Sequence, residues 1–300
     1  MIQGGRAVAL GFFDGLHLGH QKLLEETVRL AGEYSLTPAV LSFDVPPHAL
    51  VSGQSCMLIS GTEERRELLH RLFGIDEMLL LHFDETLRRM SWEDFTELLR
   101  REYGASALVA GYDFRFGYRG EGTAEKLMEK CRACSIPCRI VEKVTLDGTV
   151  VSSTHIRALL SQGNVEEAER FLGHPYFLRG RVTHGYAIGR TLGFPTANLT
   201  RESGVLLPKR GVYATLAHLE NGQTVSAVTN IGRRPTFDGE QDTIESHLLD
   251  FSGDLYGQTL RLELKAFLRP ERPFPDVESL KQQIEEDRAG ARLLLQDRKA

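Results

Sequence analysis

The sequence predicts an α/β domain built on a parallel sheet, followed by an antiparallel β-barrel or sandwich domain that one helix closes. Strand-like apolar runs alternate with helix-like stretches through the first half, which is typical of a covered parallel sheet. Short alternating segments between glycine and proline turns fill the second half, which favours an antiparallel barrel. The length of 300 residues, with 41% hydrophobic and 26% charged residues, fits a soluble globular chain of two domains.

The first half yields five strands and four helices. The strand-like runs lie at residues 7–10, 39–43, 78–82, 108–110 and 139–144, and the helix-like stretches at 21–33, 62–73, 92–103 and 124–134. The third helix has an N-cap at Ser91, with Asp94 three residues later. Strands and helices in turn predict a Rossmann-like domain whose ligands bind beyond the carboxyl ends of the strands.

Two short helices and a set of short strands follow. The helices begin at Ser152 and Val165, and the second ends at Gly173-His174-Pro175, a typical helix stop. We therefore expect domains at 1–173 and 174–300. The strands of the second domain are expected at 178–183, 212–218, 225–229, 244–250 and 260–267, with a closing helix from about 276 to 295.

Charge and hydropathy exclude several classes of protein. The net charge of −5 argues against a general nucleic-acid binder, although a small anion such as ATP needs only a local positive site. No apolar run approaches the ~20 residues of a membrane helix. The N-terminus lacks a signal-peptide pattern, so we expect a cytoplasmic protein that does not associate with membranes.

The cysteine spacing does not favour a metal site. Cys131, Cys134 and Cys138 lie close together, but Cys56, the remaining cysteine, is far away in the sequence. Zinc and iron–sulfur sites usually need a fourth ligand. We expect free, mostly buried thiols and no disulfide framework.

The most informative segment is 11–20, which contains two histidines separated by Leu18 and Gly19. His17 and His20 lie where the first strand turns into the first helix, so free N–H groups and the helix dipole favour a phosphate there. The glycines let the backbone come close, and two imidazoles are able to donate to phosphate oxygens. This spacing is typical of nucleotidyltransferases, whereas a lone histidine at a helix start is usually structural.

The P-loop motif Gly-x-x-x-x-Gly-Lys-Ser/Thr occurs nowhere in the sequence. A P-loop kinase is therefore excluded. Thr196 and Asn198, two apart on an extended segment, face the same way and offer a hydroxyl and an amide oxygen to Mg²⁺ and phosphate. A plain turn at the end of a strand is the alternative there. Glu245 falls in a half-buried strand, where a carboxylate on the inward face requires a reason.

Taken together, six segments make the chain resemble the bacterial bifunctional riboflavin kinase/FAD synthetase family over nearly its whole length. The segments, in order, are 11–20, 111–117, 152–157, 193–199, 230–237 and 245–251.

The resemblance implies that the first domain adenylylates FMN with ATP to give FAD and pyrophosphate. It implies that His17 and His20 stabilise the crowded phosphorus, and that Ser153, Thr154 and Arg157 hold the β and γ phosphates. An ordinary N-cap is the alternative for the serines and threonine. The further ligand-binding positions that the resemblance implies are Gly11, Phe13, Asp14 and Gly19, with Asp113 at a ribose or metal.

The resemblance implies that the second domain phosphorylates riboflavin to FMN, leaving ADP. Glu245 is then the general base for the ribityl hydroxyl, and Thr196 and Asn198 bind Mg²⁺ and ATP. An ion pair with Arg234 is the alternative role of Glu245. The remaining binding positions are Gly180 (as the start of a loop at 180–190 over the nucleotide), Gly193, Asn230 and Arg234.

The chain departs from the family pattern at two positions. Pro46 stands where the family has a histidine after the second strand, and His155 stands where it has an arginine. Two alternatives therefore stay open: a riboflavin kinase whose first domain is a weakened or redirected nucleotidyltransferase, and a flavin-nucleotide sensor without turnover. Retention of Glu245 disfavours the sensor.

Overall fold

The computed structural model describes residues 4–46, 57–185, 188–236 and 239–296, without the side chains of 188, 190, 234–236 and 239–241. The chain divides into two compact units, Met1–Ser153 and Thr154–Ala300, and each has its own hydrophobic cluster. In the described part of the chain, no helix combines the length and apolar character needed to cross a membrane.

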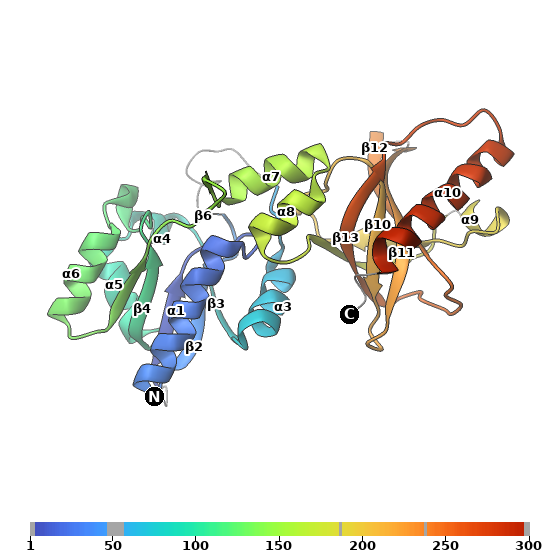
Figure 1. The fold of residues 1–300 in the computed structure, drawn as a ribbon. Coiled ribbons are helices and arrows are strands. Elements are labelled where there is room, and N and C mark those ends of the chain that lie inside the picture. The colour runs from blue at the N-terminus through green and yellow to red at the C-terminus, as the bar shows by residue number, and fades with distance from the viewer. Residues whose placement is uncertain (1–3, 47–56, 186–187, 237–238, 297–300) are drawn as a thin grey trace. The chain divides into compact units, whose positions relative to one another are not determined.

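Five parallel strands form the sheet of the first unit, in the order β3-β2-β1-β4-β5 (Figure 1). They are β1 (Arg6–Leu10), β2 (Thr37–Phe43), β3 (Glu77–Leu81), β4 (Ala105–Gly111) and β5 (Cys138–Val141). Chain order reverses between β1 and β4. The carboxyl ends of these two strands therefore form the switch point where α/β sheets bind ligands.

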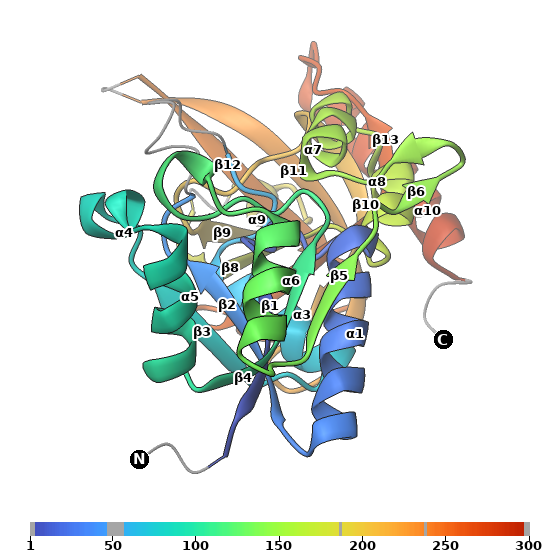
Figure 2. The ribbon, with the colours of Figure 1, turned by 90° about the vertical axis from the view of Figure 1, so that its left-hand side faces the viewer.

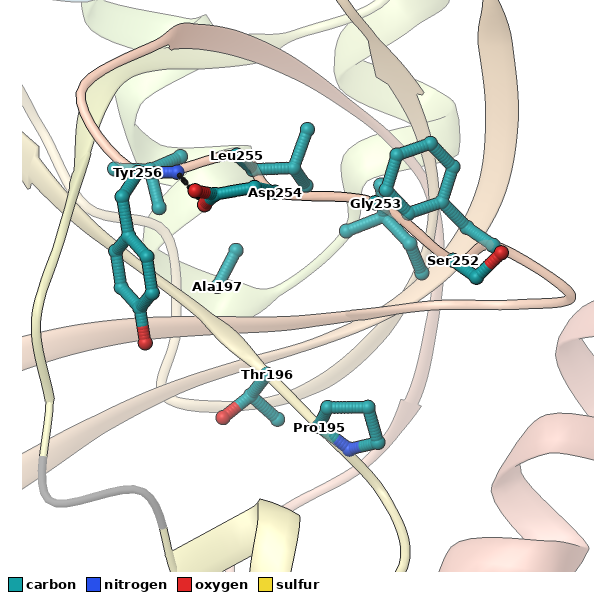
Figure 3. A pocket seen from close by; sticks show the side chains of 11 residues that line it. Pro195, Thr196, Ala197, Ser252, Gly253, Asp254, Leu255 and Tyr256 are labelled. Atoms are coloured by element: carbon teal, nitrogen blue, oxygen red, sulfur yellow. Dashed lines mark hydrogen bonds between the residues drawn. The ribbon is translucent and has the colours of Figure 1, made fainter.

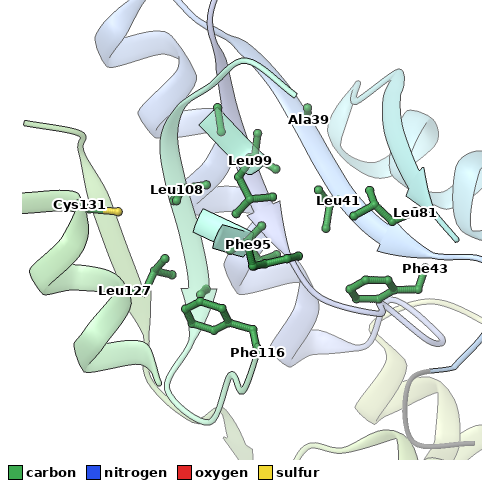
Figure 4. Packing of buried hydrophobic residues seen from close by; sticks show 14 residues of the cluster. Ala39, Leu41, Phe43, Leu81, Phe95, Leu99, Leu108, Phe116, Leu127 and Cys131 are labelled. Atoms are coloured by element: carbon green, nitrogen blue, oxygen red, sulfur yellow. The ribbon is translucent and has the colours of Figure 1, made fainter. Parts of the chain in front are cut away.

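Helices cover both faces of this sheet (Figures 1 and 2). On one side lie α1 (Leu18–Tyr34) and α3 (Thr62–Phe73), and on the other α5 (Trp92–Arg101) and α6 (Ala124–Ala133). Phe95 of α5 and Leu127 of α6 belong to the apolar cluster on their side of the sheet, and Cys131 of α6 is buried with them (Figure 4). The Rossmann-like prediction is confirmed, and so is the Ser91 cap, whose Oγ accepts from the N–H of Asp94 at 3.0 Å.

The second unit contains a closed barrel of six strands, in the order β10-β11-β12-β9-β8-β13. They are β8 (Phe177–Thr183), β9 (Ala197–Arg201), β10 (Gly211–His218), β11 (Thr224–Thr236), β12 (Gly239–Leu248) and β13 (Thr259–Arg269). The neighbouring strands in this order pair antiparallel, and β13 pairs with β10 to close the barrel. The barrel is confirmed over the sandwich.

Four helices accompany the barrel strands in the chain: α7 (Ser153–Gln162), which starts at the unit boundary, α8 (Val165–Leu172), α9 (Ile188–Thr191) and α10 (Val277–Leu295). The N-cap of α10 is Asp276, whose side chain accepts from the N–H of Ser279 at 2.7 Å. It packs across β10, β11 and β13, with Ala291 and Leu295 in the same cluster as Val212. This confirms the closing helix.

Several short elements were not predicted. These are β9, α9, α4 (Glu85–Arg89), the 3₁₀ turn η1 (Tyr118–Gly120) and the hairpin of β6 (Thr145–Leu146) and β7 (Thr149–Val150). Each has five residues or fewer, so no hydrophobic period develops within it. In β9 only Ala197 and Leu199 are buried, which is too little alternation to mark a strand.

A buried ion network lies on β13. Glu263 is 6% exposed; its carboxylate lies 2.5 Å from Nη2 of Arg261 and 3.3 Å from Nζ of Lys265 and Nε2 of His218. Burial alone raises the pKa of Glu263, but the contact with His218 and the two cationic charges outweigh it and bring the pKa to about 2. The carboxylate is therefore ionised at any ordinary pH.

We expect this network to make the barrel unit acid-sensitive. Because the folded-state pKa lies below the ordinary 4.5, the stabilisation is complete above that pH and is lost between about 4.5 and 2. It amounts to about 3 kcal/mol. Unfolding free energies of Glu263→Gln and the parent, measured from pH 6 to pH 3, should differ at pH 6 and converge on acidification. Glu278→Gln on the exposed face of α10 is the control, and a pH-independent difference would contradict the assignment.

Candidate active sites

The two histidines of the first unit stack on each other at the start of α1. His17 is the N-cap residue of this helix, and its Nδ1 accepts from the N–H of His20 at 3.3 Å. That bond places the proton of a neutral His17 on Nε2, leaving Nε2–H as the donor. The ring centroids lie 3.6 Å apart at 14°. Gly19 leaves room beside them, because an ideal Cβ there lies only 3.2 Å from the ring of His17.

The electrostatic environment keeps His20 neutral. Burial, followed by the charges of His17 and Arg65, holds the pKa of His20 well below its usual value. Among the described residues none hydrogen-bonds to the buried Nδ1 of His20. A neutral imidazole with an unpartnered ring nitrogen, next to a helix N-terminus, is suited to a phosphate or a water that a phosphate displaces.

The turn before this helix is strained and firmly anchored. Phe13 and Leu16 have φ of 59° and 40° although both are bulky and fully buried, a conformation that persists where the surroundings enforce it. Oδ1 of the buried Asp14 accepts from the N–H of Ile59 at 2.8 Å and of Ser60 at 3.1 Å. Asp14 therefore holds the turn against the segment before α3, rather than presenting its carboxylate to solvent.

Ser153, 139 residues away in sequence, reaches the same turn. Its Oγ donates to the carbonyl of Asp14 at 3.1 Å. The structure thus brings together His17, His20 and Ser153 of the predicted site. Thr154 and Arg157 lie on α7 in the second unit, where the ring of His155 contacts Phe171 of α8 edge-on at 4.6 Å. That aromatic contact gives His155 a packing role.

An aromatic pocket of about 750 Å³ lies beyond the ends of β2, β3 and β4. Its lining comprises Phe43, Phe83, Leu87, Arg88, Phe95 and residues 114–120. Phe43 and Phe83 meet edge-to-face at 5.4 Å, and Phe114 stacks on Phe116 at 5.4 Å. The pocket suits a flat apolar ring system with polar edges. Asp113, on the same loop, is exposed.

The segment 111–117, which contains Phe114 and Phe116, was singled out in the sequence, but sequence reasoning missed Phe43 and Phe83 of this pocket. A signal was present, because Phe43, Phe83 and Phe114 each come at or within three residues of the end of a strand. Sequence reasoning also missed Arg65, a buried arginine that lies between the turn and β2. A charged residue in an amphipathic helix gives no sign of its burial.

In the barrel, the row Asn198–Glu245–Asn230 crosses three neighbouring strands. Register pairs Glu245 of β12 with Asn198 of β9 on one side and with Asn230 of β11 on the other. Residues directly opposite one another share a face of the sheet. The side chains of these three residues are half-buried, while their neighbours Ile244 and Ser246 are buried.

The expectation that Glu245 faces inward is wrong. Thr215, Thr229 and Ser246 form a chain of hydroxyl contacts of 2.8 and 2.9 Å inside the barrel, and all three are fully buried. Because side chains alternate along β12, Glu245 projects from the outer face. The packing inside the barrel therefore involves other residues than Glu245, and no inward carboxylate has to be explained at this position.

Thr196 lines a second pocket, of about 550 Å³, at one end of the barrel (Figure 3). Pro195, Ala197 and the segment 251–256 form other parts of its wall. Asp254 Oδ1 accepts from the N–H of Tyr256 at 2.9 Å, which fixes this segment, and the ring of Tyr256 stacks on His184 at 3.9 Å.

Two glycines leave room for the oxygen donors. An ideal Cβ on Gly185 collides with the side-chain amide of Asn198, and one on Gly189 lies 3.2 Å from Oγ1 of Thr196. The loop that carries them begins after Thr183, because Gly180 lies inside β8; the expected loop start at Gly180 is therefore wrong. A hydroxyl, an amide oxygen and the nearby carboxylate are ligands that Mg²⁺ accepts, so the donor set fits this ion.

The remaining predicted positions lie around this site. Gly193 precedes the Pro195 turn and has a φ of 90°. Arg234 belongs to β11, but its side chain lies outside the described residues, so its pairing with Glu245 stays a prediction. His247, which sequence reasoning missed, contacts the Pro195 carbonyl through Nδ1 at 2.8 Å. It lies two residues after Glu245, so the strand period was the available signal.

The cysteines show no disulfide among the described residues, where Cys131, Cys134 and Cys138 are free thiols. Cys56 lies outside the described residues. Within those residues no group of three or more His, Cys, Asp or Glu side chains is arranged for a metal ion.

Two family models match the chain, one in each half. The model of FAD synthetase matches residues 1–155, and the model of riboflavin kinase matches residues 172–295. Together they cover the residues of both candidate sites except Arg157, which lies between the two matched ranges.

Curated relatives match over nearly the whole chain. Proteins named bifunctional riboflavin kinase/FMN adenylyltransferase are 36% identical in Listeria monocytogenes and 37% identical in Bacillus subtilis, covering 96% of this chain and 91% and 92% of theirs. The Escherichia coli K12 protein of the same name is 33% identical over 97% of this chain and 93% of its own. A crystal structure of a macrolide-efflux protein from Streptococcus pneumoniae superposes with a TM-score of 0.87 at 32% identity, covering 97% and 95% of the two chains.

Proposed function

The chain belongs to the bifunctional riboflavin kinase/FMN adenylyltransferase family, and from that premise we propose how its residues divide two reactions. The enzyme phosphorylates riboflavin with ATP to give FMN and ADP, and it adenylylates FMN with a second ATP to give FAD and pyrophosphate. The presence of both family domains favours this function over a kinase with a redirected first domain and over a sensor.

In the first unit, the FMN phosphate attacks the α-phosphorus of ATP and pyrophosphate leaves. Nε2–H of His17 and the ring of His20 donate to the α-phosphate, where negative charge accumulates, and the N-terminus of α1 adds its dipole. Ser153, Thr154 and Arg157 hold the β and γ phosphates. Gly11, Phe13, Asp14 and Gly19 shape the turn, and Asp113 contacts the ribose or a metal.

The flavin ring of FMN occupies the aromatic pocket next to this turn. Phe43, Phe83, Phe114 and Phe116 supply apolar faces, and Arg88, Arg115 and Arg119 supply cations at its lining. This arrangement supports an aromatic, anionic substrate. The pocket lies beyond the carboxyl ends of strands, as expected for an α/β sheet.

In the second unit, the adenosine of ATP occupies the pocket lined by Thr196 and Tyr256. The phosphates pass Thr196 and Asn198 toward Glu245, which removes the proton of the ribityl hydroxyl as that oxygen attacks the γ-phosphorus. Riboflavin approaches from the side of Asn230, whose amide donates to Glu271 at 3.1 Å. Gly180, Gly193 and Arg234 complete the binding positions.

Mg²⁺ is proposed as the metal, held by Thr196 and Asn198. When bound, it neutralises the charge of the ATP phosphates. We also propose a functional boundary between residues 173 and 174. The family models end and begin at 155 and 172, so α7 and α8 fall largely between them. A cytoplasmic location without nucleic-acid or membrane partners stays our proposal from composition.

One chromatogram tests the function. The protein is incubated with riboflavin, ATP and Mg²⁺, and separately with FMN, ATP and Mg²⁺. FMN and FAD in the first reaction, and FAD with pyrophosphate in the second, are expected. FMN alone indicates the weakened first domain, and no product indicates the sensor.

Restoring the family residues at the two departures should accelerate FAD formation. The double variant Pro46→His and His155→Arg adds two donors for phosphate, and charge-assisted hydrogen bonds are each worth about 1.5–3 kcal/mol, or tenfold and more. The initial rate of FAD formation from FMN measures the gain. An unchanged rate would remove the idea that these positions slow the reaction.

A further inference from the structure

A buried arginine supports the turn that carries the two histidines. Arg65, in the first turn of α3, is 1% exposed. Its Nη1 donates to the carbonyl of Phe12 at 2.8 Å and to Oγ of Ser42 at 2.7 Å, and its Nη2 donates to Oγ1 of Thr62 at 3.2 Å. The guanidinium also lies over the ring of Phe12, 4.6 Å from its centroid.

These contacts connect the turn after β1 to the end of β2. Ser42, in β2, donates to the same Phe12 carbonyl at 2.9 Å, and Nη2 of Arg65 also approaches the carbonyl of Phe43 at 3.4 Å. The planar fork of a guanidinium reaches several acceptors at once, which an ammonium does not. A buried charge persists only where such bonds compensate its loss of water.

We propose that Arg65 is a positioning residue for adenylyl transfer: through the Phe12 carbonyl it fixes the turn that aims His17 and His20 at the α-phosphate. At 1% exposure it acts through the turn and not by contact with a substrate. The inference rests on the proposed adenylyltransferase function of the first unit. It adds a residue that none of the predicted motifs contains.

The charge of Arg65 also acts on the site. It is one of the groups, after burial and His17, that hold the pKa of His20 low. A cation fixed in a poorly solvated region favours the negative charge that adenylyl transfer accumulates. Removal of the charge should therefore raise the pKa of His20, whereas a change of shape alone should not.

The test compares Arg65→Gln, Arg65→Lys and the control Arg66→Gln. Arg66 is the next residue of α3, its side chain is 41% exposed, and it lies 3.8 Å from Glu63. We expect Arg65→Gln to lower kcat of FAD formation by ~10²-fold, the scale of a displaced catalytic group, with KM nearly unchanged. Arg65→Lys should lose about tenfold. Arg66→Gln should match the parent, and all variants should retain FMN formation by the second unit.

A second readout separates positioning from general stability. NMR titration of the His20 ring should show a raised pKa in Arg65→Gln and the parent value in Arg65→Lys, which keeps the charge. Loss of FAD formation with an unchanged His20 pKa in both variants would indicate only a structural role and overturn the proposal.

The remaining outcomes are also decisive. A folded Arg65→Gln with kcat within threefold of the parent overturns the proposal. If Arg65→Gln unfolds the first unit, Arg65→Lys decides: parent kcat overturns the proposal, and a reduced kcat at unchanged KM supports it. If the parent protein itself makes no FAD, the proposed adenylyltransferase function is contradicted. This outcome differs from every outcome that tests the role of Arg65.

Discussion

Glu245→Gln is expected to lower FMN formation by ~10²–10⁴-fold, the usual value of general-base assistance. The primary hydroxyl of riboflavin must lose its proton as it attacks the γ-phosphorus. Glu245 lies on the outer face of the barrel, directly opposite Asn198 in the neighbouring strand. Glutamine keeps the size of the side chain and removes its basicity, so binding of ADP and flavin should persist while kcat falls.

Both half-reactions are measured on the same preparation. The variant should still convert supplied FMN into FAD, because that site lies in the first unit, and retained binding of ADP and flavin shows that the mutated barrel is folded. Glu202→Gln, an exposed glutamate after β9, is the matched control. Kinase turnover near the parent value would return Glu245 to the role of an ion-pair partner.

His20→Ala should produce the second large effect, a loss of at least ~10²-fold in FAD formation, the scale of removing one group that stabilises transition-state charge. The change removes the ring that stacks on His17 at 3.6 Å and leaves the phosphate site without one of its two imidazoles. Formation of FMN from riboflavin should continue at the parent rate. Both rates are read from one time course of products.

His70→Ala is the matched control for this variant. His70 is an exposed histidine of α3, 73% exposed in its side chain, whose Nδ1 contacts Asp76. It should leave both reactions intact. FAD output from His20→Ala within a few-fold of the parent would show that His20 does not act on the phosphate.

The sequence predicted the architecture because the buried side chains of a helix or a strand recur along the sequence at a regular spacing. The strands of the first unit and the helix at 92–103 were found from their apolar spacing, and Ser91 marked the start of that helix. A hydrophobic period does not develop within five residues, so neither the helix α4 nor the strand β9 was predicted. The length of an element, more than its type, decided whether it was predicted.

The site was only partly predictable for a different reason. Motif spacing led to His17 and His20, and the resemblance to the family led to Glu245. The sequence pattern carried no information on whether Glu245 faces the inside or the outside of the barrel. Side chains alternate between the two faces of a strand, but the alternation alone does not say which face is inside. Arg65 and Phe83 act at the site through tertiary contacts from other elements, and such contacts leave no local pattern.

The alternation of inward and outward side chains along β12 has a consequence for how this protein can change in evolution and in the laboratory. Ser246, at 0% exposure, is constrained by the volume and hydroxyl contacts inside the barrel, whereas Glu245, the proposed general base, and His247, which contacts the Pro195 carbonyl, lie on the outside. Exchanging Thr215, Thr229 and Ser246 together for apolar residues of similar shape leaves no buried hydroxyl of this trio without a hydrogen bond, and it removes no side chain from the outer face. Thermal tolerance and catalytic specificity can thus be selected at alternate positions of the same strand, largely independently of each other.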